Sequence, residues 1–253
     1  MALSFQNGVA YQEVKPQDAD SLPIILVHGA GSSHLGWPSG IRHLPGRHIF
    51  AIDLPNHGKS AKKELNSIEE YALDLQVFLD SLGIEKANLV GYSMGSAIVL
   101  QILFQNPAFC AQIALLAYTP DPVFEEFYEQ ALPGQVNRFD WVQGFTQKLF
   151  QTGFSEAQKG KVGEPLFHAD RETLKNDLLI THQYCPVYPE RKCTVPALFL
   201  LGENDPFSNP VQKQDMIDHF STSSVKTLAH AGHLFIWEYP EMVEGYLLDF
   251  FKS

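Results

Sequence analysis

A serine flanked by two glycines, in G-Y-S-M-G at residues 91–95, is the first group in this sequence that could do covalent chemistry. A short apolar run at 86–90 precedes it and a longer one at 96–104 follows it. This pattern predicts a buried strand, a sharp turn and a helix. Such a turn strains the serine backbone and lifts its hydroxyl clear of the sheet, while only small residues fit two positions to either side. Ser93 is therefore the candidate nucleophile.

A serine hydroxyl is a poor nucleophile unless a base takes its proton. The sequence contains ten histidines, and His233 differs from the others in its position. It follows a predicted strand at 224–228 and precedes a predicted C-terminal helix at 240–251. A loop after the last strand of an α/β sheet lies at the carboxyl edge, where Ser93 is also expected. His233 is therefore the candidate base.

A carboxylate should orient this imidazole and stabilise its charged form. The predicted strand at 196–202 is followed directly by E-N-D-P at 203–206, which places two carboxylates at the same sheet edge. Asp205 is the better candidate for the acid, and Glu203 is the weaker one.

The chain order Ser93, Asp205, His233 resembles that of the α/β-hydrolase superfamily, and the resemblance covers nearly the whole sequence. It implies an α/β fold with a mostly parallel central sheet flanked by helices and a helical cap inserted after strand 6. It also leaves Asp121, after the predicted sixth strand, as an alternative acid, because some members of the superfamily place it there.

The turn H-G-A-G-S-S at 28–33, after a predicted strand at 22–27, resembles the turn that supplies one oxyanion-hole N–H in this superfamily. Carried over, that donor is the N–H of Ala30, and the second is the N–H of Met94. Two such donors stabilise a developing oxyanion. His28 is interpreted as fixing the turn by hydrogen bonding.

The segment D-L-P-N-H-G-K-S at 53–60 resembles the superfamily's D-x-P-G-x-G-x-S loop after the fourth strand. Asn56 replaces the usual glycine, and asparagine also tolerates a positive φ. Asp53 and His57 are interpreted as structural residues of this loop.

A serine nucleophile, in place of the aspartate of epoxide hydrolases and haloalkane dehalogenases, implies an acyl enzyme. The S-M-G-S run resembles the S-M-G-G of small carboxylesterases, perhydrolases and carbon–carbon bond hydrolases, with Ser96 replacing the last glycine. We predict a serine hydrolase that cleaves small, largely apolar carboxylic esters. Thioesterase, lactonase, perhydrolase and carbon–carbon bond hydrolase activities remain alternatives on the same triad. A hydrolase-fold ligand receptor with slow turnover is the alternative from another class.

The composition argues against several classes of binding partner. The 253 residues carry 18 Lys and Arg against 29 Asp and Glu, a net charge of −11 that argues against nucleic acid and anionic membranes. No apolar run approaches the roughly 18 residues of a membrane span. Cys110, Cys185 and Cys193 form no zinc-binding pattern and are expected to be reduced thiols in the cytoplasm. A small-molecule substrate with no cofactor and no metal is expected, and the oligomeric state cannot be predicted.

The predicted core comprises residues 1–118 and 194–253, with a helical cap at 119–193. Strands are expected at 9–14, 22–27, 48–52, 88–90, 112–116, 197–201 and 225–228, and alternation with helices indicates a mostly parallel sheet. A helix is expected at 67–82, capped by Ser67 with Glu70 three residues on. The cap segment shows no convincing strand but holds eleven aromatic residues. They are expected to pack the cap onto the core, and some to line an apolar pocket above Ser93.

Overall fold

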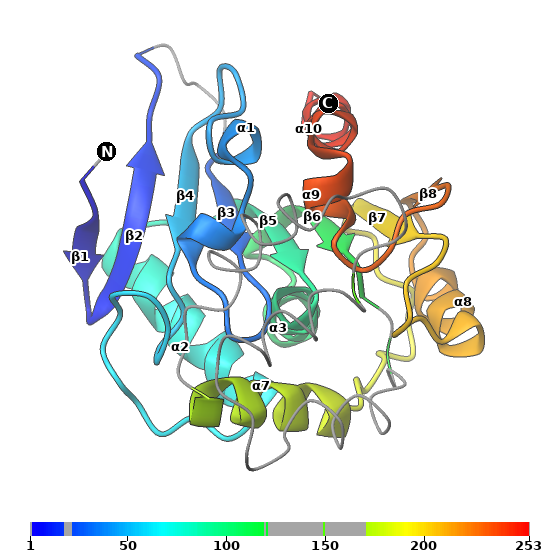
Figure 1. The fold of residues 1–253 in the computed structure, drawn as a ribbon, viewed down its shortest axis with the longest axis horizontal. Helices are drawn as coiled ribbons and strands as arrows, with labels where there is room; N and C mark the ends of the chain where they lie inside the picture. The colour runs from blue at the N-terminus through cyan, green and yellow to red at the C-terminus, as the bar shows by residue number, and fades with distance from the viewer. Residues whose placement is uncertain (1, 18–21, 119, 121–148, 150–170, 253) are drawn as a thin grey trace.

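The computed structural model describes residues 2–17, 22–118, 120, 149 and 171–252. Within them lies one eight-stranded sheet in the order β1-β2-β4-β3-β5-β6-β7-β8, with helices on both faces (Figure 1). The strands are β1 Ser4–Gln6, β2 Val9–Val14, β3 Ile24–Val27, β4 Ile49–Ile52, β5 Ala87–Tyr92, β6 Cys110–Leu116, β7 Ala197–Gly202 and β8 Ser223–Leu228.

The pairs β1–β2 and β2–β4 are antiparallel, and the remaining pairs are parallel. The predicted mostly parallel sheet is therefore confirmed, and all seven predicted strands are present. The prediction missed β1, a short edge strand that forms a hairpin with β2. Its signal was the Asn7-Gly8 pair, where both residues have positive φ (50° and 80°), as a two-residue hairpin turn requires.

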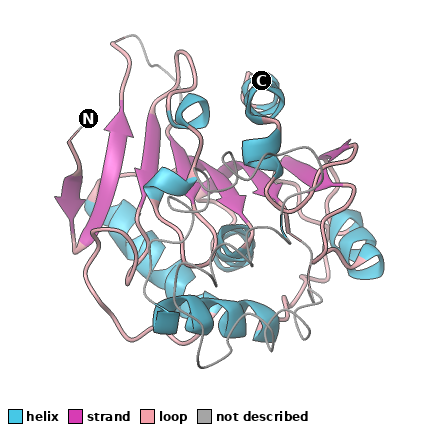
Figure 2. Ribbon diagram, in the orientation of Figure 1, coloured by secondary structure: helices cyan, strands magenta, loops and turns pink. Residues whose placement is uncertain are grey.

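Helices cover the two faces unequally, as Figure 2 also shows. In Figure 1, α2, α3 and α7 lie on one side of the sheet and α1, α9 and α10 on the other. The bounds are a 3-10 turn at His34–Gly36, α1 Ser39–Arg42, α2 Ile68–Ser81, α3 Met94–Gln105, α7 Arg171–Gln183, α8 Pro210–Asp218, α9 Phe235–Glu238 and α10 Pro240–Phe250.

The predicted N-terminal capping residue of α2, Ser67, is confirmed. Ser67 precedes the helix, and its hydroxyl accepts a hydrogen bond from the Glu70 N–H at 3.2 Å. The Glu70 carboxylate reaches back to the N–H of Asn66 at 2.6 Å, one residue before the usual partner in a capping box. These bonds use donors that the first turn of a helix leaves without intrahelical partners.

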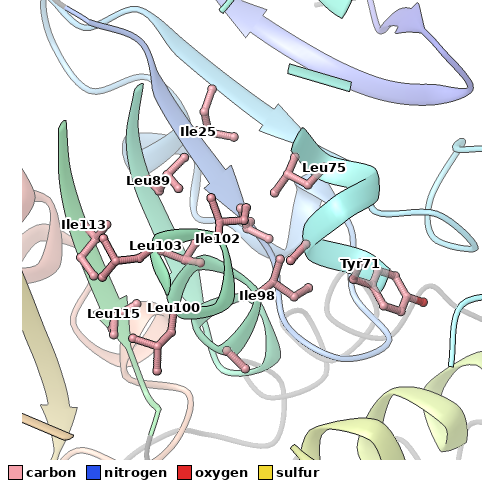
Figure 3. Packing of buried hydrophobic residues seen from close by; sticks show 14 of the residues in the cluster. Ile25, Tyr71, Leu75, Leu89, Ile98, Leu100, Ile102, Leu103, Ile113 and Leu115 are labelled. Carbon is pink, nitrogen blue, oxygen red and sulfur yellow. The ribbon is translucent and has the colours of Figure 1, made fainter. Parts of the chain in front are cut away.

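Two apolar clusters hold the sheet between its helices. Alternate residues of β3 face opposite ways: Ile25 packs with α2 and α3, while Ile24 packs with α1 and α10. Figure 3 shows the first cluster, in which side chains of α3 lie against β5 and β6 and Tyr71 lies on α2. Because both faces are covered, the central strands are continuously buried, which places them rigidly under the site.

The predicted cap, 119–193, falls largely outside the described residues, and so do nine of its eleven aromatic residues and Asp121. Its described part contains α7, which packs against α3. The hydroxyl of Tyr184 donates to Gln101 Oε1 of α3 at 2.8 Å, and the ring of Tyr188 packs edge-on against Phe104 at 5.6 Å. Over the described part of the chain, no helix has both the length and the apolar composition needed to cross a membrane.

Candidate active site

Ser93 stands in the turn between β5 and α3, at the carboxyl edge of the sheet. Its φ of 54° and ψ of −120° lie in a region that residues other than glycine rarely adopt. Neighbouring backbone holds this conformation: the Ser93 N–H donates to Leu116 O at 2.8 Å, and Ser93 O accepts from Ser96 N at 2.8 Å. The predicted strand, sharp turn and helix are therefore present.

The glycines on either side of Ser93 allow a very close approach of strand and helix. A Cβ atom at Gly95 would lie 2.1 Å from the carbonyl oxygen of Val27 in β3. One at Gly91 would lie 2.4 Å from the carbonyl oxygen of Gly95. The predicted need for small residues at both positions is confirmed, because any side chain would push α3 away from the sheet.

His233 lies in the loop after β8, where its imidazole reaches Ser93. His233 Nε2 lies 3.0 Å from Ser93 Oγ, and His233 Nδ1 lies 2.9 Å from Asp205 Oδ2. The histidine and aspartate side chains are only 5% and 8% exposed. If Nδ1–H donates to the carboxylate, Nε2 presents its lone pair to the serine hydroxyl, which is the tautomer that proton removal requires.

Asp205 follows β7 and has both carboxylate oxygens engaged. While Oδ2 faces His233, Oδ1 accepts the N–H of Phe207 at 2.9 Å. The alternative acid Glu203 is directed elsewhere: its carboxylate accepts the N–H of His230 at 2.8 Å and is half exposed. Of these two carboxylates, the structure places Asp205 beside the imidazole.

Backbone hydrogen bonds join the loops after β7 and β8. Glu203 N donates to Leu228 O at 3.0 Å, and Asn204 N donates to Ala231 O at 2.9 Å. These bonds hold the loop that contains Asp205 against the loop that contains His233. The backbone itself therefore keeps the two side chains close together.

Three residues hold His233 or its loop in place and were not predicted from the sequence. The Tyr92 hydroxyl donates to the backbone oxygen of His233 at 2.8 Å, and the ring of Phe207 meets the imidazole edge-on at 4.8 Å. Glu238 accepts the N–H of Gly232 at 2.8 Å. Tyr92 could have been suspected because it adjoins Ser93 in β5, whereas the other two contacts depend on loop conformation.

The H-G-A turn approaches Ser93 closely: a Cβ atom at Gly29 would lie 3.2 Å from Ser93 Cβ. His28 Nδ1 lies 2.8 Å from Gly29 O, and His28 Nε2 accepts the N–H of Leu54 at 3.1 Å. A neutral imidazole satisfies both bonds. Burial, with a smaller contribution from nearby His57, lowers the pKa of His28 to about 3. The interpretation of His28 as a residue that fixes the turn is confirmed.

Ala30 lies in the turn after β3, and Met94 directly follows Ser93. Met94 is the first residue of α3, so no helix carbonyl precedes its N–H. The positive end of the helix dipole lies at the same point. Ala30 follows Gly29 in the turn that lies against Ser93. The role of Ala30 and Met94 as oxyanion donors stays a prediction.

Asp53 is fully buried and organises the loop after β4. Its Oδ1 accepts both the N–H and the Nδ1–H of His34 at 2.7 Å, and its Oδ2 accepts the N–H of Lys59 at 2.9 Å. Burial alone would raise the pKa of Asp53, but these bonds outweigh it and lower the pKa. Asn56 has the expected positive φ, 71°. The structural interpretation of Asp53 is confirmed.

Ser96, which departs from the S-M-G-G pattern, has a defined structural role. Its hydroxyl accepts the N–H of Leu116 and donates to the carbonyl oxygen of the same residue, both at 3.0 Å. A glycine could make neither bond. Ser96 therefore ties the first turn of α3 to the end of β6.

A mostly parallel sheet with a strained serine, a histidine and a carboxylate at its carboxyl edge is the arrangement of an α/β hydrolase. A sequence model of the alpha/beta hydrolase fold family matches residues 23–157, more than half of the chain. The chain belongs to this family.

Individual relatives agree with this assignment. The chain is 25% identical over 262 residues to the uncharacterized carboxylesterase nap of Bacillus subtilis, covering 94% of this chain and 81% of the relative. The structure also resembles that of an alpha/beta hydrolase fold protein from Chitinophaga pinensis, with a TM-score of 0.82 and 19% sequence identity. The superposition covers 100% of this chain and 97% of the Chitinophaga pinensis chain. The structural likeness supports the fold, and the relatives support a hydrolase of this family.

A local match is stronger but shorter. Over 97 residues the chain is 37% identical to the dihydrolipoyllysine-residue acetyltransferase component of the acetoin cleaving system of Pseudomonas putida. That match covers 38% of this chain and 26% of the relative, so it spans about a quarter of that protein's length.

Proposed function

We propose that this protein is a serine hydrolase that cleaves small, largely apolar carboxylic esters through an acyl enzyme. The observation that carries the proposal is the continuous hydrogen-bonded series from Ser93 through His233 to Asp205, with distances of 3.0 and 2.9 Å. This geometry supports Ser93 as the nucleophile, His233 as the base and Asp205 as the orienting carboxylate of an acyl transfer. The carboxylesterase name of the Bacillus subtilis relative supports the same chemistry.

In the proposed reaction, Ser93 Oγ attacks the ester carbonyl while its proton passes to His233 Nε2. Asp205 stabilises the resulting imidazolium. The tetrahedral oxyanion accepts hydrogen bonds from the N–H groups of Ala30 and Met94. His233 then protonates the leaving alcohol, which departs and leaves the acyl group on Ser93. Water, deprotonated by His233, attacks this acyl enzyme and releases the acid.

The substrate class is inferred from the segment at 119–193, which we propose forms a cap over Ser93. Its eleven aromatic residues would supply an apolar lining for an uncharged acyl or aryl group. Each buried methylene adds about 0.8 kcal/mol of binding. For nitrophenyl esters, kcat/KM should then rise about fourfold per carbon and fall where the pocket ends.

The test combines labelling with turnover. A fluorophosphonate probe should modify the wild-type protein at Ser93, as peptide mass spectrometry would show, and should not modify Ser93→Ala. The variant should lose turnover of an activated nitrophenyl ester by several orders of magnitude, up to about 10⁶, with an unchanged circular dichroism spectrum.

Three results would contradict different parts of the proposal. A variant that keeps more than about a tenth of wild-type turnover, against the losses seen when a serine nucleophile is removed, would exclude Ser93 as the nucleophile. A flat acyl series, or preference for a charged ester over a neutral one of equal size, would exclude the apolar substrate class. Labelling without measurable turnover of any ester would favour the slow ligand receptor instead.

A further inference from the structure

Asp177, on α7, contacts the oxyanion turn from across the fold. Its side chain is completely buried, and its Oδ2 accepts the N–H of Gly31 at 2.8 Å. Gly31 directly follows Ala30, the proposed oxyanion donor. The same Oδ2 lies 2.7 Å from Nε2 of His57, which belongs to the loop after β4. One carboxylate oxygen thus joins α7, the oxyanion turn and that loop.

The partner imidazole is positively charged. His57 Nδ1 lies 2.8 Å from the carbonyl oxygen of Pro55, and its Nε2 faces the Asp177 carboxylate, so both nitrogens face acceptors and both must carry hydrogens. Burial is the largest single influence and lowers the pKa of His57, but the charge of Asp177 and the hydrogen bonds to Asp177 and Pro55 together outweigh burial, so the pKa is raised.

Other polar groups also surround this pair. The neutral His28 ring lies 4.9 Å from the His57 ring, and the hydroxyl of Tyr71 lies 3.4 Å from Asp177 Oδ1. The negative charge of Asp53 also raises the pKa of His57. Stability alone does not account for so much buried charge, because a buried ion pair seldom stabilises a fold more than apolar packing would.

The role of the Asp177–His57 pair follows from the position of the Gly31 N–H that Asp177 accepts. The Gly31 N–H belongs to the rigid peptide that begins at the carbonyl of Ala30, and it is separated from the Ala30 N–H by a single Cα. The turn contains Gly29 and Gly31, the latter at φ 64°, so its backbone has little intrinsic preference for one orientation. An external acceptor at Gly31 therefore limits how the Ala30 N–H can rotate.

We propose that Asp177, held in place by protonated His57, is a positioning residue that sets the direction of the Ala30 N–H. Because Asp177 lies on α7, the segment inserted between β6 and β7 thereby controls the oxyanion hole. The inference rests on the proposed function, since it assumes that Ala30 supplies an oxyanion donor.

The principal variant is Asp177→Asn, which keeps an acceptor oxygen but removes the charge. Its kcat for a nitrophenyl ester should fall about 10-fold to 100-fold, less than or similar to the loss of one oxyanion donor, while KM stays within about threefold. Affinity for an aryl trifluoromethyl ketone, whose adduct places an oxyanion in the same hole, should fall by the same factor.

A matched control lies one residue away. Asn176 Nδ2 donates to Leu65 O at 3.0 Å, so Asn176→Ala removes a contact between α7 and the core that does not reach the turn. It should leave kcat and ketone affinity unchanged. His57→Gln, which keeps a donor toward Asp177, should retain more kcat than His57→Ala. The effects of Asp177→Asn and His57→Ala should not add, because they break one network.

The outcomes separate this inference from the function on which it rests. If the wild-type protein neither reacts with a fluorophosphonate nor hydrolyses esters, the proposed function fails. If the wild-type protein does both, but Asp177→Asn and His57→Ala keep wild-type kcat and ketone affinity, the positioning role alone is wrong. If Asp177→Asn does not fold, the ranking of the two His57 variants decides the question, and equal kcat values overturn the inference.

Discussion

Asp205 and Glu203 lie two residues apart after the same strand, yet their carboxylates do different work. Asp205 Oδ2 lies 2.9 Å from the imidazole of His233, whereas Glu203 binds the backbone N–H of His230. Both residues lie in the loop after β7, where side chains two residues apart need not share one face as they do in a strand. One side chain therefore points toward the site, and the other is half exposed.

Replacing these carboxylates should therefore have unequal effects. Asp205→Asn should lower kcat by about 10⁴, because the neutral amide favours the wrong imidazole tautomer. Glu203→Gln should change kcat by no more than about threefold, as expected for a group that does not touch the reacting atoms. Steady-state hydrolysis of a nitrophenyl ester would measure both. A larger loss in Glu203→Gln would reassign the acid.

At this scale, the sequence predicted the residues that belong to local motifs and missed those that meet across the chain. Ser93 is marked by its glycine neighbours, and His233 and Asp205 by their places after strands. Asp177 gave no comparable signal, because it is a single acid on a helix whose neighbours Leu174 and Leu178 suggest only an apolar face. Its partner Gly31 is 146 positions away.

A buried side-chain hydroxyl, that of Ser96, contributes to the junction of α3 with β6. Ser96 satisfies both backbone groups of Leu116, where a glycine would leave them without this partner. The position is completely buried, so solvent does not reach these hydrogen bonds. What looks like a small departure from a motif thus changes how the nucleophile's helix is fastened to the sheet.

Ser96→Ala should lower the free energy of unfolding by about 1–3 kcal/mol, because it removes two hydrogen bonds from a completely buried position, although Leu116 O keeps the Ser93 N–H as a partner. Urea denaturation would measure this loss, and kcat should stay within about threefold because Ser96 does not reach the reacting atoms. Ser81→Ala is the control: Ser81 is exposed, its hydroxyl donates to Phe78 O in the last turn of α2, and its loss should cost less than about 0.5 kcal/mol. Equal losses in the two variants would contradict the argument.

Among the strands, the inner ones and β8 were predictable from the sequence, whereas the short edge strand β1 was not. The inner parallel strands, β3 to β7, are largely apolar and buried, so their positions follow from composition to within about two residues. At the edge, β1 has only three residues and little burial. The cap boundaries at 119 and 193 remain a prediction, since an amphipathic segment does not show from composition how it docks.

Two buried histidines, His28 and His57, have pKa values shifted in opposite directions, and both shifts affect the stability of the whole fold. His28 is held neutral, with its pKa lowered to about 3, while His57 is held charged, with its pKa raised. An unfolded histidine titrates near 6.5, so each contributes a dependence of stability on pH. The contribution of His57 is fully present below pH 6.5 and is lost as pH rises through its raised folded pKa.

The neutral His28 predicts a loss of stability in acid. Between pH 6.5 and about 3 the unfolded chain binds a proton that the folded protein does not, so the free energy of unfolding falls as pH falls. The loss should reach on the order of 4 kcal/mol at pH 3, and the lowered pKa of Asp53 acts in the same direction.

Urea unfolding at a series of pH values would measure this dependence. His28→Gln removes the titrating group, so its unfolding free energy should fall less steeply than that of the wild-type protein over the same pH range. The overall stability of the variant does not matter for the test, because only the slope is compared. Identical slopes would show that His28 is not the group responsible.

The place of His233 in the chain has a consequence for synthesis. Ser93 precedes it by 140 residues, and His233 is synthesised only after β8, which within the described residues lies at the end of the sheet beside β7. Because ribosomes make the N-terminal part first, a nascent chain can hold the strained serine long before its proton acceptor exists. The proposed hydrolysis therefore begins only when the final strand has joined the sheet, and unfinished chains carry a serine that is no more reactive than an ordinary alcohol.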